Sequence, residues 1–202
     1  MSRLVGARDE QGVSLIELMI YMSLLVIVSI LAGSILISGL RGQRDISNVG
    51  SATSQAQLIT SSVEAGIRSA STFDVSTTTV GQRLIARVGT FTAAGTATWQ
   101  CRAWLFTTDK RLLTLSSTSG TVAAPANLAA AVSGWTLLAS NVSIAAGSSA
   151  LFAESGTAPK SILTIAAQVG VAGGTGNPAI VQTQVTQLAL PTTAGTGPAT
   201  CS

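Results

Sequence analysis

The sequence predicts an α+β protein, in which a long N-terminal α-helix packs on a C-terminal antiparallel β-sheet domain. First, no charged residue occurs from Leu18 to Leu40, as in a membrane-spanning helix. Second, no proline precedes Pro125, and small or apolar residues recur at steps of three and four as far as Ala70. Third, beyond Asp74 the chain consists of short runs rich in Val, Ile and Thr, separated by turn-forming residues.

The apolar run begins directly after a single carboxylate. From Leu18 to Leu40 there are 23 residues. A helix of that length measures roughly 35 Å and spans a hydrocarbon core of about 30 Å. Glu17 stands at its front edge, where an ionisable group costs about 2.5–3.5 kcal/mol. We therefore interpret Glu17 as a functional residue that needs a partner.

The chain itself offers that partner. Gly12 is small and closes a short polar leader. A cut after Gly12 would create a new amino group on Val13, one helical turn before Glu17. The ammonium and the carboxylate would neutralise each other, within one chain or between neighbours. Between neighbouring chains, the pair would hold the subunits in a fixed axial stagger.

The stretch from Gly12 to Glu17, with the leader before it and the apolar run after it, resembles the prepilin processing motif of type IV pilins and type II secretion pseudopilins. The resemblance implies a pilin fold and cleavage after Gly12 by a prepilin peptidase. It further implies that Val13 is the methylated N-terminus and that Glu17 pairs with a neighbour's N-terminus during assembly. The implied partners are this peptidase, other pilin or pseudopilin subunits, and membrane lipid before assembly.

The expected domain organisation has four parts. Residues 1–12 form the cleaved leader, 13–40 the transmembrane and filament-core helix, 41–72 its amphipathic continuation, and 73–202 an extracytoplasmic β-rich domain. One helix is expected from about Ser14 to about Ser71, the alternative being two helices with a break near 39–42. One face of the continuation is small or apolar and is expected to be buried: Val49, Ala52, Ala56, Ile59, Val63, Ile67 and Ala70.

The second half is predicted to be mostly strands. Their expected ranges are 77–80, 83–88, 98–107, 111–115, 135–139, 141–143, 149–152, 161–166 and 179–188, with a short helix at 126–132. A turn at 109–110 makes a hairpin, and alternation places Trp99, Cys101 and Ala103 on one face. The glycine-rich segment 170–178 is interpreted as a hairpin loop and not as a phosphate cradle, because strands are predicted on both sides of it.

The order of these elements resembles the larger minor pilins and pseudopilins of the J/W type. The matching pieces are Leu138-Ala139, Asn141-Val142, Leu151-Phe152, Pro159 and the two terminal strands. This resemblance favours a minor subunit. The absence of proline from the membrane half of the helix favours it too, because many major pilins carry one there.

The two cysteines, Cys101 and Cys201, are an even pair outside the apolar run, which predicts a disulfide. The bond would close a loop of about 100 residues, worth roughly 4–5 kcal/mol on the chain-entropy model. It would pin the C-terminus onto the sheet. Two free thiols remain the alternative.

The composition argues against an enzyme. Charged residues make up 9% of the chain, and histidine is absent, so the usual general base near neutral pH is missing. The acids are dispersed, without the spacing of a metal site, and no cofactor is predicted. The net charge of +3 has no basic run, so direct binding of nucleic acid is not predicted. Six aromatic residues are expected in core packing, a binding patch being the alternative: Phe91, Trp99, Trp104, Phe106, Trp135 and Phe152.

We therefore expect a structural subunit, a minor pilin of a type IV pilus or related filament. It would be held once through the plasma (inner) membrane with its C-terminal domain outside, then enter a cell-surface or periplasmic filament. The alternatives are a type II secretion pseudopilin, a DNA-uptake pilin, and a single-pass surface protein whose β-domain binds a ligand. A secretory signal peptide cut near residues 32–34 is a further alternative.

Overall fold

The computed structural model describes residues 14–91, 97–156, 162–173, 176–188, 197 and 200–202. Its elements are α-helices and antiparallel β-strands, which confirms the predicted α+β class. The contacts divide the chain into two units, Met1–Arg44 and Asp45–Ser202. The first helix belongs to both units, and all the other helices and strands belong to the second.

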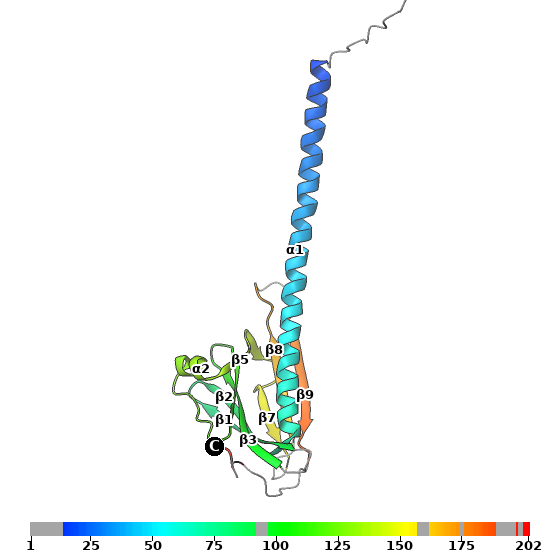
Figure 1. The fold of residues 1–202 in the computed structure, drawn as a ribbon. Helices are drawn as coiled ribbons and strands as arrows, with labels where there is room; N and C mark the ends of the chain where they lie inside the picture. The colour runs from blue at the N-terminus through cyan, green and yellow to red at the C-terminus, as the bar shows by residue number, and fades with distance from the viewer. Residues whose placement is uncertain (1–13, 92–96, 157–161, 174–175, 189–196, 198–199) are drawn as a thin grey trace, which may run out of the picture. The chain divides into compact units, whose positions relative to one another are not determined.

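Helix α1 runs without interruption from Leu15 to Arg68, over 54 residues (Figure 1). The single long helix is thus confirmed, and the alternative of a break near residues 39–42 is wrong. Gly39 and Gly42 lie inside the helix. The helix tolerates them because each glycine costs only about 1 kcal/mol and removes no backbone hydrogen bond. The helix ends three residues before Ser71, since strand β1 already begins at Ala70.

The first sheet has five antiparallel strands in the order β1-β2-β3-β4-β5 (Figure 1). The predicted start of the first strand at Thr77 is wrong, since β1 already begins at Ala70. Helical spacing of small and apolar residues continues to Ala70, so the sequence pattern does not reveal that the backbone is extended there. Val80, predicted as a strand end, lies in the β1–β2 turn. The predicted hairpin around 109–110 is confirmed as β3–β4. The bounds are β1 Ala70–Thr78, β2 Gly81–Phe91, β3 Ala97–Thr107, β4 Leu112–Ser117 and β5 Thr136–Ala139.

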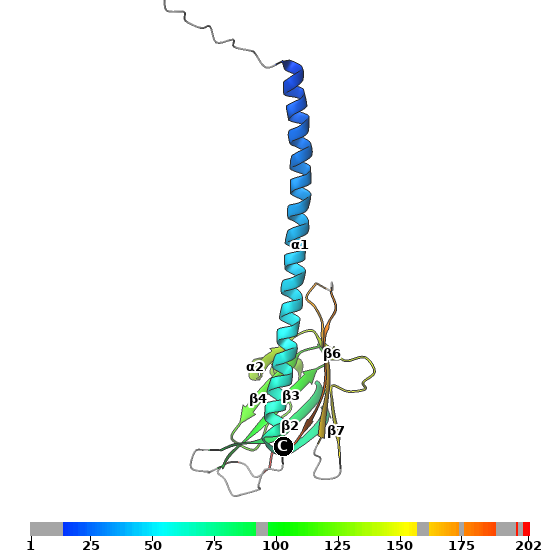
Figure 2. The ribbon, with the colours of Figure 1, turned by 90° about the vertical axis from the view of Figure 1, so that its right-hand side faces the viewer.

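The second sheet is built around β8, which pairs with β6 and β7 through different parts of its length and with β9 along all of it. Figure 1 labels β7, β8 and β9, and Figure 2 labels β6. The two last predicted strands are thereby confirmed as β8 and β9. The antiparallel pairing of β8 with β9 also confirms that segment 170–178 joins a hairpin. The strand predicted at 149–152 lies later, as β7. The bounds are β6 Val142–Ile144, β7 Phe152–Ser155, β8 Ile162–Val169 and β9 Ala179–Thr186, and the short helix α2 is Leu128–Gly134.

The larger core forms where the second half of α1 meets both sheets. The predicted helix face is buried from Ala52 to Ile67, whereas Val49 is 39% exposed. Trp104 from the first sheet and Ile165 from the second belong to the same cluster. The helical spacing of small and apolar residues therefore predicted the buried side of the helix correctly over most of its length.

A smaller core covers the opposite face of the first sheet, under α2 and residue Val122. Trp99, Cys101 and Ala103 are fully buried on this face, as alternation predicted. Trp104 points to the other face and is also fully buried, so β3 is covered on both sides. Trp135 is largely buried too, but it precedes β5. Of the remaining aromatics, Phe152 is buried, Phe106 is partly buried, and the side chain of Phe91 lies outside the description.

Candidate functional site: the N-terminal helix and the disulfide

The first half of α1 is apolar and exposed. Every large apolar side chain from Leu15 to Leu40 is at least half exposed. The most apolar window of the helix has a mean hydropathy of 2.5, and none of it is buried. An uninterrupted apolar surface of this length is far larger than the patches that soluble proteins expose to water. By length and composition, this is a helix that can cross a membrane once.

Glu17 lies in the first turn of α1, and Tyr21 is its side-chain partner among the described residues. The hydroxyl of Tyr21, one turn later, donates to Oε1 of Glu17 over 3.1 Å. Of the predicted processing site, Gly12 and Val13 lie outside the described residues. Sequence reasoning missed Tyr21. The signal was present, because it is the only tyrosine in the chain and stands four residues from the only acid of the span.

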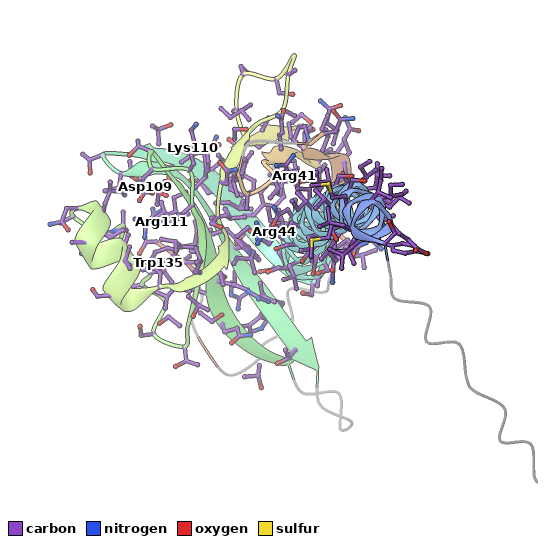
Figure 3. The ribbon with its side chains drawn as sticks, turned by 90° about the horizontal axis from the view of Figure 1, so that it is seen from above. Arg41, Arg44, Asp109, Lys110, Arg111 and Trp135 are labelled. Carbon is purple, nitrogen blue, oxygen red and sulfur yellow. A yellow bond between two sulfur atoms is a disulfide. The ribbon has the colours of Figure 1, made fainter. Side chains whose placement is uncertain are left out.

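The far end of the apolar segment is marked by charge. Arg41, Arg44 and Asp45 follow Leu40 within two turns, and all are exposed. Figure 3 labels both arginines and also the group Asp109, Lys110 and Arg111 of the second unit. Within the described part of the chain, the ion pairs join Arg68 to Glu64 and Arg111 to Asp109.

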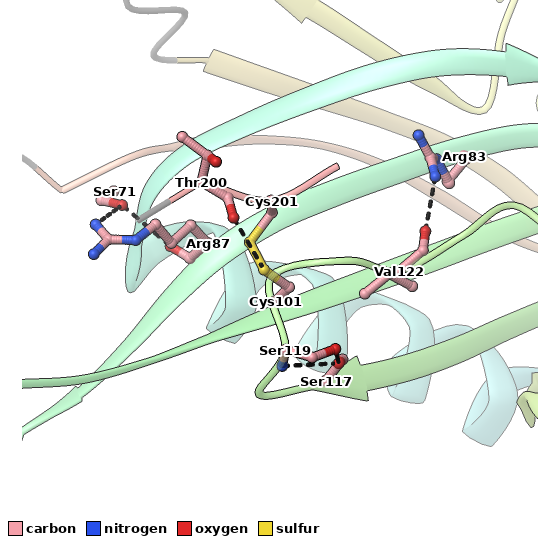
Figure 4. The surroundings of a disulfide bond; sticks show 9 residues. All are labelled: Ser71, Arg83, Arg87, Cys101, Ser117, Ser119, Val122, Thr200 and Cys201. Atoms are coloured by element: carbon pink, nitrogen blue, oxygen red, sulfur yellow. Dashed lines mark hydrogen bonds between the residues drawn. A yellow bond between two sulfur atoms is a disulfide. The ribbon is translucent and has the colours of Figure 1, made fainter. Parts of the chain in front are cut away.

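Cys101 and Cys201 form a disulfide, which confirms that prediction (Figure 4). Their Cα atoms are 5.6 Å apart, and they are separated by 100 positions. Two backbone hydrogen bonds reinforce the attachment, from Ser202 N–H to the Gly120 carbonyl (3.1 Å) and from Val122 N–H to the Ser202 carbonyl (2.8 Å). The disulfide and these two hydrogen bonds thus hold the last residues against the face of the first sheet on which Cys101 lies.

The β3–β4 turn holds a cluster of charged residues, Asp109, Lys110 and Arg111. Arg111 Nε donates to Asp109 Oδ2 over 2.7 Å, and the buried Thr107 hydroxyl donates to Asp109 Oδ1. These hydrogen bonds, that from Arg111 first, lower the pKa of Asp109 below its ordinary value. These hydrogen bonds join residues of the β3–β4 turn to one another, which indicates that the cluster stabilises the turn. Among the described residues, no three His, Cys, Asp or Glu side chains lie together as a metal site would require.

A groove of about 520 Å³ lies between α1 and the start of β9. Its charged lining residue is Glu64, which accepts a hydrogen bond from the Thr183 hydroxyl over 3.3 Å and pairs with Arg68. The rest of the lining is small, hydroxylated or apolar: Thr53, Ala56, Gln57, Thr60, Ser61, Ala179, Ile180 and Val181.

Comparison of the chain with protein-family models, with curated proteins and with solved structures finds no match. The features from which a function can be inferred are therefore those of the molecule itself. They are the Glu17–Tyr21 pair, the exposed apolar half of α1, and the disulfide.

Proposed function

We propose that this chain is a structural, non-enzymatic subunit of a type IV pilus or related filament, and specifically a minor pilin. A prepilin peptidase would cut it after Gly12 and leave Val13 as the methylated N-terminus. The observation that carries the proposal is Glu17, a lone carboxylate in the first turn of a 54-residue helix whose first half is apolar and exposed. A plain membrane anchor has no use for that carboxylate.

During assembly, the contacts of the apolar helix with lipid would be replaced by contacts with the same helix of neighbouring subunits. In the bilayer, lipid tails cover the apolar surface from Leu18 to Leu40; in a filament, the same surface of neighbouring subunits covers it. Glu17 would neutralise the N-terminal amine of a neighbour, because an isolated charge is costly in an apolar bundle whereas a matched pair is tolerated. One such pair per subunit fixes the axial offset between neighbours.

The disulfide supports placing the second unit outside the cytoplasm. Disulfides persist in oxidising compartments and are rare in the reducing cytosol. The basic residues that flank the span do not orient it by themselves, since Arg3 and Arg8 precede it while Arg41 and Arg44 follow it. The Cys101–Cys201 bond therefore favours the inner-membrane topology with the C-terminal unit exported.

The decisive experiment is the intact mass and N-terminal sequence of the protein isolated from its own membranes. The proposal expects a chain that begins at Val13 and carries one methyl group on its amine. A chain that retains Met1 would overturn it, and so would one cut near Ala32. The pseudopilin and DNA-uptake alternatives share this N-terminus, and they are separated from a pilus by whether deletion of the gene abolishes surface filaments, protein secretion or DNA uptake.

The groove between α1 and β9 favours a second candidate, a single-pass surface protein whose β-domain binds a ligand without assembling. This candidate predicts an unmethylated N-terminus and a monomer in the membrane. The same mass measurement therefore separates it from the filament subunit.

A further inference from the structure

The hydroxyl of Tyr21 differs from those of three serines in the same apolar segment. Ser23, Ser29 and Ser34 each donate to a carbonyl of their own helix, over 2.8, 2.7 and 2.8 Å. Such bonds satisfy a hydroxyl in lipid without any second side chain. Tyr21 instead donates to a side chain, the carboxylate of Glu17, over 3.1 Å.

The geometry of a helix makes this contact a natural one. Long side chains in an α-helix point back toward its N-terminus, so a residue at position i+4 lies over the residue at i. Tyr21 thus reaches toward the end of the span at which Glu17 stands. A phenol and a carboxylate that are both surrounded by lipid have no water to bond, and each removes the other's unsatisfied polar group.

We infer that Tyr21 is a positioning residue of the assembly site, an inference that rests on the proposed function. Its hydroxyl holds Oε1 of Glu17 while the subunit waits in the bilayer, and it fixes the direction in which the carboxylate points. The second carboxylate oxygen, Oε2, is left for the incoming ligand. That ligand is the protonated, primary or methylated N-terminal amine of another subunit.

The contact can be tested without any filament, because Tyr21 is the only tyrosine in the chain. Full-length protein labelled with ¹³Cζ-tyrosine and reconstituted in phospholipid bilayers gives one tyrosine signal in solid-state NMR. The inference expects this signal to shift in Glu17→Leu and to stay in place in Ser23→Ala, which removes a nearby hydroxyl that does not reach Glu17. A signal that is the same in wild type and Glu17→Leu overturns the inference.

The positioning role is tested by assembly. Tyr21→Phe keeps the ring and removes the hydroxyl, and it should lower incorporation into filaments by about threefold, the usual weight of one side-chain hydrogen bond in a membrane. Ser23→Ala should assemble normally.

Unchanged incorporation of Tyr21→Phe overturns the positioning role even if the contact is detected. The N-terminal mass is measured on the same samples. If the wild-type chain begins at Val13 and Tyr21→Phe assembles normally, only the positioning role of Tyr21 is overturned. If the wild-type chain keeps Met1, the proposed function itself is overturned.

Discussion

The indole ring of Trp104 lies directly against Gly66, at a point where a Cβ on the helix would overlap the ring. One turn earlier on α1, Ser62 accepts a hydrogen bond from Trp104 Nε1 over 3.0 Å. The side chain of Trp104 therefore joins the second half of α1 to β3 in two ways, by the packing of its ring against Gly66 and by its hydrogen bond to Ser62. This contact sets how closely the helix approaches the first sheet.

Gly66→Ala should lower the free energy of unfolding of the second unit by about 1–3 kcal/mol, because the added methyl overpacks the buried Trp104. The control is Gly50→Ala, at a helical glycine where the added Cβ meets nothing within 4 Å beyond the local helix backbone. That variant should be more stable by about 0.5–1 kcal/mol, since alanine favours the helix. Equilibrium denaturation in detergent, followed by tryptophan fluorescence, compares the two. Equal effects at both glycines would contradict the close contact.

The spacing of apolar residues within one helix or strand predicted which of its faces is buried. The spacing from Ala52 to Ile67 predicted the buried face of α1, and alternation around Cys101 predicted one of the two buried faces of β3. The start of β1 could not be read, because Ala70 satisfies helical spacing and strand burial equally well.

The partners of single polar residues were also out of reach of the sequence pattern. Gln82 bonds to Phe152, 70 positions away, and Ser62 bonds to Trp104, 42 positions away. These pairings depend on how the two sheets and the helix meet, and no periodicity records that. Of the candidate site, the sequence supplied Glu17 and the disulfide but not Tyr21, although that contact spans only one helical turn.

Glu17→Leu should enter the membrane as well as the wild type or better, because it removes the acid from the apolar segment. Its incorporation into filaments should be lost, since no carboxylate remains to neutralise the neighbouring amine. Membrane fractionation and immunoblotting of sheared filaments measure the two steps separately. Asp45→Asn, which removes an exposed acid from the same helix, serves as the control and should assemble. Normal assembly of Glu17→Leu would rule out the charge pair.

Replacing both Cys101 and Cys201 by serine should lower the free energy of unfolding by about 2–5 kcal/mol, as expected for a bond that closes a long loop. Thermal unfolding with and without reductant gives the measurement. Reductant should destabilise the wild type and leave the double variant unchanged. Non-reducing peptide mapping should link the two cysteine peptides, and a free thiol at either position would refute the bond.

The Asp109–Arg111 pair predicts part of the acid sensitivity. The folded pKa of Asp109 lies below its ordinary value of about 3.8, so the folded state stabilises the ionised form. That stabilisation is complete above the unfolded pKa and is lost as the pH falls through the folded pKa. Asp109→Asn should therefore reduce the slope of stability against pH below about pH 4. Arg111→Met should do the same, because Arg111 is the main cause of the shift. A slope that neither variant changes would show that the pair does not contribute.

Gln82 joins the two sheets in place of a strand pairing. Its Nε2 donates to the Phe152 carbonyl over 2.7 Å, and its Oε1 accepts from the Phe152 N–H over 3.0 Å. Gln82→Met keeps the length of the side chain but leaves both backbone groups of Phe152 unpaired in a partly buried position, which should cost about 1–3 kcal/mol. Gln57→Met, at an exposed glutamine of α1, is the control and should change stability by less than about 0.5 kcal/mol. Slow hydrogen exchange at the Phe152 amide in the wild type should become fast in Gln82→Met alone. If that amide stays protected, β7 is held by its pairing with β8 and not by the glutamine.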